Sequence, residues 1–132
     1  CTGGWVGKEF TGIPGSSSWY GFGFITYSNK AKLKSLGVIK DTLMEEGAVS
    51  ERVVKEMAEG VLRNSGSDFA ISISGIAGPT GGTDDKPVGT VCFGIGSQDN
   101  INCFTECFEG DRDEVRKQSV AFALKELLKC LQ

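Results

Sequence analysis

The stretch from Ala70 to Pro87, AISISGIAGPTGGTDDKP, constrains the fold more than any other part of this sequence. A short apolar run breaks there into a loop that contains Gly75, Gly78, Gly81 and Gly82. Four or five apolar residues bounded by glycine and proline predict a buried strand rather than a helix. Because glycine lets backbone N–H groups approach a ligand closely, the loop is either an anion-binding turn or an ordinary tight connection. Glycine spacing alone leaves both interpretations open.

Length and charge place the chain among ordinary acidic domains. Its 132 residues suffice for one hydrophobic core. The net charge is -3, and the sequence has no cluster of basic residues that would favour nucleic acid as a partner. No apolar stretch approaches the roughly 20 residues of a membrane span, and no signal peptide is recognisable. We therefore expect a cytoplasmic, single-domain protein that binds neither membrane nor nucleic acid.

The five cysteines are odd in number and widely scattered, which favours reduced thiols over a disulfide framework. Cys103 and Cys107 lie in INCFTECF, which reads as a strand. Four residues of strand separate them by roughly 13 Å, too far for both thiols to bind one zinc ion. We expect structural thiols and no metal.

The absence of histidine restricts the possible chemistry most strongly. Within this chain a Ser-His-Asp or Cys-His mechanism is impossible, and the commonest zinc ligand is missing. Any general base must therefore be a lysine, a carboxylate, a tyrosine or an α-amine.

Helical and strand patterns alternate along the chain. Within residues 1–11 and again within residues 12–19, we expect a turn that leads into a helix. Further helices are expected at Asn29–Leu36, at about Thr42–Glu46, at Ser50–Asn64 and from Asp111 to the C-terminus. The expected strands are Tyr20–Tyr27, weakened by two glycines, Phe69–Ile73, and a hairpin within Val88–Phe108 that turns at Gly96–Asn100. This order predicts a layered α/β domain with a mixed sheet.

Lys32 is a candidate general base because of its place in the sequence. It falls in the first turns of the helix that Ser28 is expected to cap, close to Lys30. The positive end of the helix dipole and the neighbouring ammonium group both disfavour a charged amine. The alternative is a solvated surface lysine, the commoner situation for this residue.

Seven blocks together resemble one family: CTGG, PGSS, YSNKAK, GAVSE, SGIAGP followed by GG, KPVGTV, and GDRDEVR. In this order they resemble the C-terminal domain of the competence/damage-inducible CinA proteins over essentially the whole chain. The resemblance implies a three-layer α/β/α sandwich that hydrolyses nicotinamide mononucleotide to nicotinate mononucleotide and ammonia in pyridine nucleotide salvage. It further implies a Ser/Lys mechanism, a homodimer and no cofactor.

The resemblance also implies roles for individual residues. Lys32 becomes the general base, Tyr27 an orienting or proton-relaying hydroxyl, and Ser74 a supporting hydrogen-bond partner. Arg112 becomes the contact for the substrate's anionic end or the oxyanion, with pairing to Asp111 or Glu114 as the alternative. The remaining residues expected at the substrate are Cys1, Thr2, Gly3, Gly4, Gly75 and Gly78.

Two departures from the family pattern stand out. The nucleophilic serine of the family directly precedes CTGG, so we expect it, with the first helix and first core strand, upstream of Cys1. Lys30 stands where relatives often carry glutamate, which should favour the neutral form of Lys32. Two other functions remain open: an N-terminal-nucleophile hydrolase that uses Cys1 and its own α-amine, and a nucleotide-binding or assembly module without catalysis.

Overall fold

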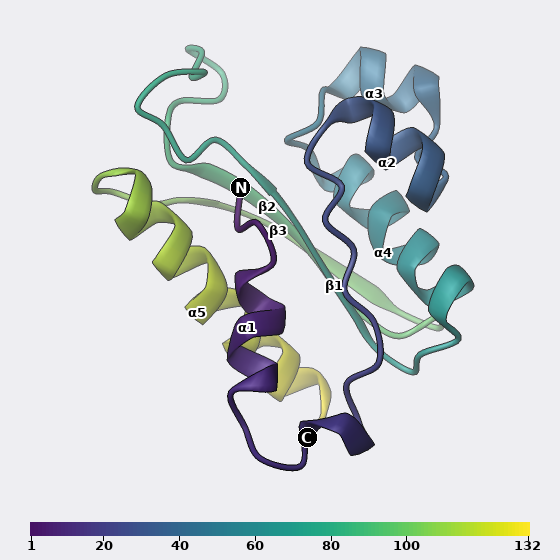
Figure 1. The fold of residues 1–132 in the computed structure, drawn as a ribbon. Coiled ribbons are helices and arrows are strands. Elements are labelled where there is room, and N and C mark those ends of the chain that lie inside the picture. Colours follow the sequence, from purple (N-terminus) through teal and green to yellow (C-terminus); the bar gives the residue numbers. More distant parts are fainter.

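A three-stranded antiparallel sheet forms the centre of the computed structural model, which describes all 132 residues. Its strands are β1 (Ala70–Gly75), β2 (Thr90–Gly96) and β3 (Ile101–Cys107), in that spatial order. Both neighbouring pairs run antiparallel, and helices cover both faces of the sheet (Figure 1). The central strand β2 is buried along its whole length because it has a strand on each side and a helical layer on each face.

Alternation along β2 divides the core into two halves. Val91, Phe93 and Ile95 pack with Val115 of the C-terminal helix, whereas Cys92 packs in the opposite cluster. Successive side chains of a strand point to opposite faces, so one continuous apolar run supplies both cores. This explains why the sequence of β2 lacks the polar alternation of an exposed strand.

On one face of the sheet lies α4 (Glu51–Ser65), which carries α2 (Asn29–Leu36) and α3 (Lys40–Glu46) on its outer side. The Ser50 hydroxyl caps α4 by accepting a hydrogen bond from the Val53 N–H at 3.3 Å. Gly60 allows α2 to approach closely, because a Cβ atom there would lie 2.0 Å from the carbonyl oxygen of Leu36. The contact between α2 and α4 fixes where α2 presents its side chains.

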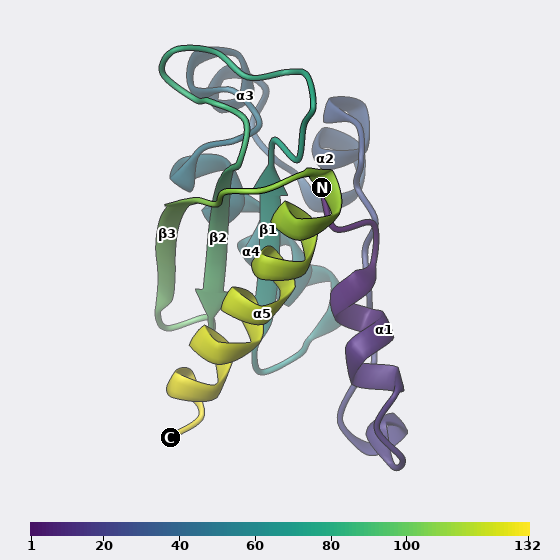
Figure 2. The ribbon, with the colours of Figure 1, turned by 90° about the vertical axis from the view of Figure 1, so that its left-hand side faces the viewer.

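The opposite face is covered by α5 (Arg112–Cys130), beside which lies α1 (Trp5–Thr11) (Figure 2). Asp111 and Glu114 form a capping box at the start of α5: each side chain accepts a hydrogen bond from the other residue's N–H. None of the helices combines the length and the apolar character that a membrane crossing needs.

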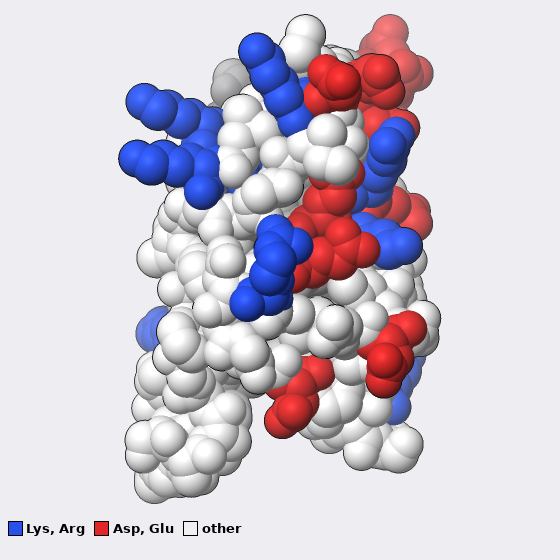
Figure 3. Space-filling view, turned by 90° about the vertical axis from the view of Figure 1, so that its right-hand side faces the viewer, with Lys and Arg blue, Asp and Glu red and all other residues white.

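An uncharged arm projects from this layer. No residue from Phe10 to Asn29 is charged, and the arm contains the end of α1 and the short 3₁₀ helix η1 (Ser16–Ser18). The Phe10 ring packs against Trp19 and Tyr20, with centroid distances of 5.3 and 5.2 Å. Figure 3 shows this arm as the white lobe at the lower left, whereas lysine, arginine and carboxylate side chains mix over the rest of that face.

The layered α/β architecture is confirmed, as are the predicted helices and the hairpin of β2 and β3. Two predictions were wrong. The three strands form an antiparallel rather than a mixed sheet, and the segment Tyr20–Tyr27 is extended but is not a strand. Residues 21–27 make no backbone hydrogen bond to another backbone group, because a cavity separates them from the free edge of β1.

Candidate active site

Lys32 is buried, with only 6 % of its surface exposed, so the solvated-lysine alternative was wrong. The Ser28 hydroxyl caps α2 by accepting from the Ala31 N–H at 3.1 Å, and this cap places Lys32 on the inner side of the first turns. Its Nζ donates to the carbonyl oxygens of Thr26 at 2.8 Å and Tyr27 at 3.4 Å. No carboxylate forms an ion pair with it.

Burial lowers the pKa of Lys32 below its ordinary value of 10.5. The sequence predicted this direction from the helix dipole and from Lys30. The structure gives desolvation as the cause, and Lys30 is exposed. A buried amine held by two carbonyl groups, without a neutralising carboxylate, is suited to accept a proton.

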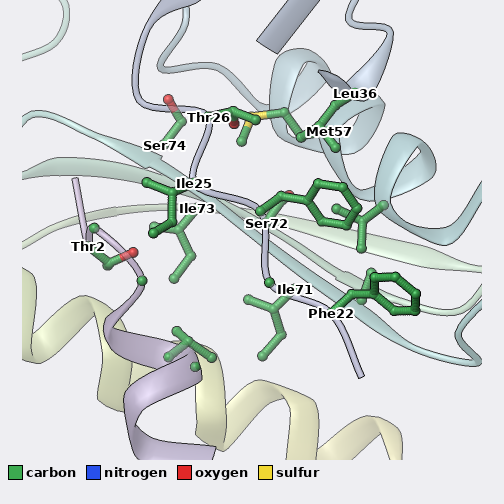
Figure 4. A pocket seen from close by; sticks show the side chains of 18 of the residues that line it. Thr2, Phe22, Ile25, Thr26, Leu36, Met57, Ile71, Ser72, Ile73 and Ser74 are labelled. Atoms are coloured by element: carbon green, nitrogen blue, oxygen red, sulfur yellow. The ribbon is translucent and has the colours of Figure 1, made fainter. Parts of the chain in front are cut away.

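Lys32 lies at the wall of a cavity of about 830 Å³ between the Tyr20–Tyr27 segment and β1. Figure 4 shows one part of it: Ser74 and Thr26 line its upper part in this view, and the apolar side chains of Ile25, Ile71 and Ile73 line the space below. Apolar side chains form most of its walls, and Ser74, Lys32 and Arg112 are among the polar residues that line it.

Nine of the ten residues expected at the site line this cavity, from four separate parts of the chain. They are Cys1, Thr2, Gly3, Gly4, Tyr27, Lys32, Ser74, Gly75 and Arg112. The tenth, Gly78, does not line it, but its carbonyl oxygen accepts a hydrogen bond from the Arg112 guanidinium at 2.7 Å. Gly78 therefore helps to hold the Arg112 side chain in place without lining the cavity itself.

Arg112 donates a second hydrogen bond to the Tyr27 hydroxyl at 3.3 Å. It forms no ion pair with Asp111 or Glu114, whose side chains instead complete the capping box. The alternative in which Arg112 only pairs at the helix start was therefore wrong. A guanidinium held by neutral groups keeps its full positive charge available for an anionic ligand.

Ser74 projects from β1 on the same side of the sheet as Ser72. The Ser72 hydroxyl donates to the Val54 carbonyl at 2.5 Å and serves packing. Ser74 lies two residues further along β1 and is 5 % exposed. Its hydroxyl has no hydrogen-bond partner in the protein. It is free to bond a molecule in the cavity.

The turn Cys1–Gly4 brings the start of the chain into the site. Gly3 and Gly4 have φ values of +62° and +93°, a left-handed conformation that favours glycine. Burial, together with the positive charges of Lys32, Arg116 and Arg112, lowers the pKa of the Cys1 α-amine to about 6. The start of the chain therefore lies within electrostatic reach of the candidate base.

Comparison with known proteins identifies the domain, because residues 1–131 match the CinA C-terminal domain. The chain belongs to this family. It is 55 % identical over 128 residues to the nicotinamide-nucleotide amidohydrolase PncC of Escherichia coli K12, covering 96 % of this chain and 78 % of that protein. A putative competence-damage inducible protein of Symbiobacterium thermophilum is 48 % identical, over 94 % of this chain and 31 % of the relative.

Solved structures of CinA proteins share the fold. The competence/damage inducible protein CihA of Agrobacterium tumefaciens has a TM-score of 0.96 at 40 % identity, over 100 % of this chain and 81 % of that one. The CinA superfamily protein of Escherichia coli has a TM-score of 0.93 at 38 % identity, over 97 % of this chain and 74 % of that one.

Sequence reasoning missed Arg116 in this CinA domain. The block GDRDEVR carries Arg112 and Arg116 four residues apart, a spacing that places both on one face of α5. Only Arg112 was singled out. The spacing was a usable signal, but the contact of Arg116 with the turn Cys1–Gly4 depends on the tertiary packing of α1 against α5.

Proposed function

We propose that this protein hydrolyses the carboxamide of nicotinamide mononucleotide, giving nicotinate mononucleotide and ammonia. The observation that carries the proposal is Lys32: a buried lysine with a lowered pKa and no carboxylate partner, at the wall of a cavity that the turn Cys1–Gly4 also lines. The relatives named PncC act on a nicotinamide nucleotide, which supports the same substrate class here.

The proposed mechanism is acyl transfer with a serine and a lysine. Neutral Lys32 removes the proton from a serine hydroxyl, and the oxygen attacks the carboxamide carbon. The C–N bond breaks, the amine of Lys32 returns its proton to the leaving nitrogen, and ammonia departs. Water then hydrolyses the ester and releases the nicotinate, with no metal or organic cofactor.

We propose that this serine is a residue directly before Cys1 in the natural protein. The α-amine of Cys1 lies near Lys32, Arg116 and Arg112, so the preceding residue would adjoin the base. We also propose that an extended segment before that serine fills the apolar part of this cavity, between residues 21–27 and β1, and that the substrate binds at the end beside Lys32, Ser74 and Arg112. Such a strand would pair backbone groups that both sides leave free toward the cavity.

Other groups of the site take supporting roles in this proposal. Arg112 binds the substrate phosphate or the developing negative charge, and Tyr27 orients Arg112. Ser74 donates or accepts a hydrogen bond at the carboxamide. Backbone N–H groups of the turn Cys1–Gly4 stabilise the oxyanion, and such donors contribute about 3 to 4 kcal/mol each in the transition state.

The test is ammonia release from nicotinamide mononucleotide by the natural full-length protein, with nicotinate mononucleotide quantified in parallel. Equal amounts of both products support the proposal. Binding of the nucleotide without ammonia would instead indicate a binding or assembly module.

One observation favours a second candidate, in which Cys1 is itself the nucleophile. With a pKa of about 6, the α-amine is mostly neutral at pH 7 and could accept the thiol proton. Intact mass of the protein from its natural host separates the two. Residues ahead of Cys1 eliminate this candidate, whereas a mature chain that starts at Cys1 eliminates the upstream serine.

A further inference from the structure

Arg116 reaches from α5 to the opposite end of the chain. Its Nε donates to the Cys1 carbonyl oxygen at 3.0 Å and one terminal nitrogen donates to the Thr2 carbonyl oxygen at 3.3 Å. Its other terminal nitrogen lies 3.7 Å from Asp113, and its guanidinium lies 5.3 Å from the centroid of the Trp5 ring. Two carbonyls, a carboxylate and a ring therefore hold Arg116 in one orientation.

The fixed carbonyl groups also fix the N–H groups that follow them. In a trans peptide the C=O bond and the next N–H bond point in opposite directions. Arg116 binds the carbonyls of Cys1 and Thr2, so the N–H groups of Thr2 and Gly3 point away from the guanidinium. Neither N–H has a hydrogen-bond partner in the protein.

The positions of two hollows indicate the direction in which these N–H groups point. Thr2, Gly3 and Gly4 separate two hollows: the large cavity beside Lys32, and a smaller one of about 330 Å³ lined by Trp5, Lys8 and Arg116. Arg116 is on the side of the smaller hollow. Groups that point away from it are therefore directed to the side where Lys32 lies.

We propose that Arg116 is a positioning residue for the reaction, one that holds the N–H groups of Thr2 and Gly3 toward the amide oxygen of the substrate. This inference rests on the proposed amidohydrolase function. Negative charge develops on that oxygen as the tetrahedral intermediate forms, and preorganised N–H donors stabilise it. Arg116 itself touches neither the substrate nor the reacting atoms.

The role predicts a specific kinetic defect. Replacing the guanidinium by the amide of Arg116→Gln leaves one short donor for two carbonyl groups, so the first peptides of the turn lose their fixed orientation. We expect kcat to fall about 10- to 100-fold, below or near the loss for deleting a whole oxyanion donor. We expect KM to change less than about threefold, because ground-state contacts of the nucleotide remain.

A thioamide substrate distinguishes positioning from a general structural role. Sulfur accepts N–H hydrogen bonds more weakly than oxygen, so an intact oxyanion site should favour nicotinamide over thionicotinamide mononucleotide. We expect the ratio of their kcat values to shrink about tenfold in Arg116→Gln. Arg52→Gln is the matched control, since Arg52 is also a helix arginine with a carboxylate one turn away, at 3.8 Å from Glu56, as Arg116 is with Asp113.

The experiment uses the full-length protein, with circular dichroism and Tm to verify folding. If Arg116→Gln does not fold, Arg116→Lys serves, with a smaller loss expected because one ammonium can still reach one carbonyl. An unchanged amide-to-thioamide ratio and kcat within twofold of wild type would overturn the inference while leaving the amidohydrolase proposal intact. A wild-type protein that releases no ammonia overturns both.

Discussion

The guanidinium of Arg112 and the hydroxyl of Tyr27 lie 3.3 Å apart, although 85 positions separate them in sequence. Arg112 comes from the first turn of α5, and Tyr27 from the extended segment just before α2. Their hydrogen bond connects the start of α5 with the segment that leads into α2 on the opposite face of the sheet, and both residues line the cavity. Two elements that the sequence presents as independent are therefore coupled at the site.

This contact predicts non-additive effects of mutation. Tyr27→Phe keeps the ring but removes the acceptor, and we expect kcat/KM to fall about tenfold, equivalent to about 1.4 kcal/mol. Arg112→Gln removes the charge and the contact with Gly78, and we expect a loss of about 100-fold. The double variant should be no worse than Arg112→Gln alone, because Tyr27 acts through Arg112. Steady-state kinetics on the three variants measure this, and fully multiplicative losses would contradict the coupling.

The lowered pKa of Lys32 predicts that activity rises with pH. The proposed base acts only as a neutral amine, so kcat/KM should increase as pH rises through a value below 10.5. A pH profile of kcat/KM between pH 5 and 10 measures it. A profile that falls across this range, with the protein still folded, would contradict a lysine base.

The same group predicts the pH dependence of stability. Between the lowered pKa of the folded state and the ordinary value in the unfolded chain, the unfolded chain binds more protons at Lys32. The free energy of unfolding should therefore increase with pH between these two pKa values. Below the lower pKa, Lys32 is charged in both states and the folded protein bears the full cost of burying the ammonium group. Urea unfolding at several pH values tests this: Lys32→Met should show a flatter dependence than wild type, and an identical slope would argue against the burial.

Gly60 is expected to be essential for positioning α2. A methyl group there would meet the Leu36 carbonyl at 2.0 Å, so Gly60→Ala must push α2 and α4 apart. Overpacking of this kind costs about 1 to 3 kcal/mol, and we expect activity to fall with it because α2 carries Lys32. The exposed neighbour provides the control, since Glu59→Ala should change stability by less than about 0.5 kcal/mol. Equal unfolding midpoints for the two variants would show that the helices can separate without cost.

Local patterns were sufficient to predict most elements of the fold. Helix α2 begins after Ser28 and ends before Gly37, as predicted, and the capping box of Asp111 and Glu114 lies at the start of α5. These signals are local: a side chain bonds an N–H three residues away, or glycine adopts a positive φ. The prediction of a strand at Tyr20–Tyr27 was wrong because a strand requires a neighbouring strand to pair with, and the composition of a segment does not show whether one is present.

The sequence predicted which residues form the site but not the packing that gives them their properties. The resemblance pointed to Lys32, Tyr27, Ser74 and Arg112, and the fold gathers them at one cavity. Burial of Lys32 could not be read from its neighbours, because it depends on how α2 packs. The reach of Arg116 to Cys1 was equally hidden, since 115 positions separate the two residues.

The most direct test of the central claim compares two lysines of the same helix. Lys30 is exposed and Lys32 is buried at the cavity, so Lys30→Met and Lys32→Met remove the same amino group at positions with different roles. With full-length protein and nicotinamide mononucleotide, we predict that Lys30→Met releases ammonia within about twofold of wild type. We predict that Lys32→Met, still folded by circular dichroism, loses about 10²- to 10⁴-fold. Wild-type ammonia release by folded Lys32→Met would contradict the assignment of Lys32 as the base.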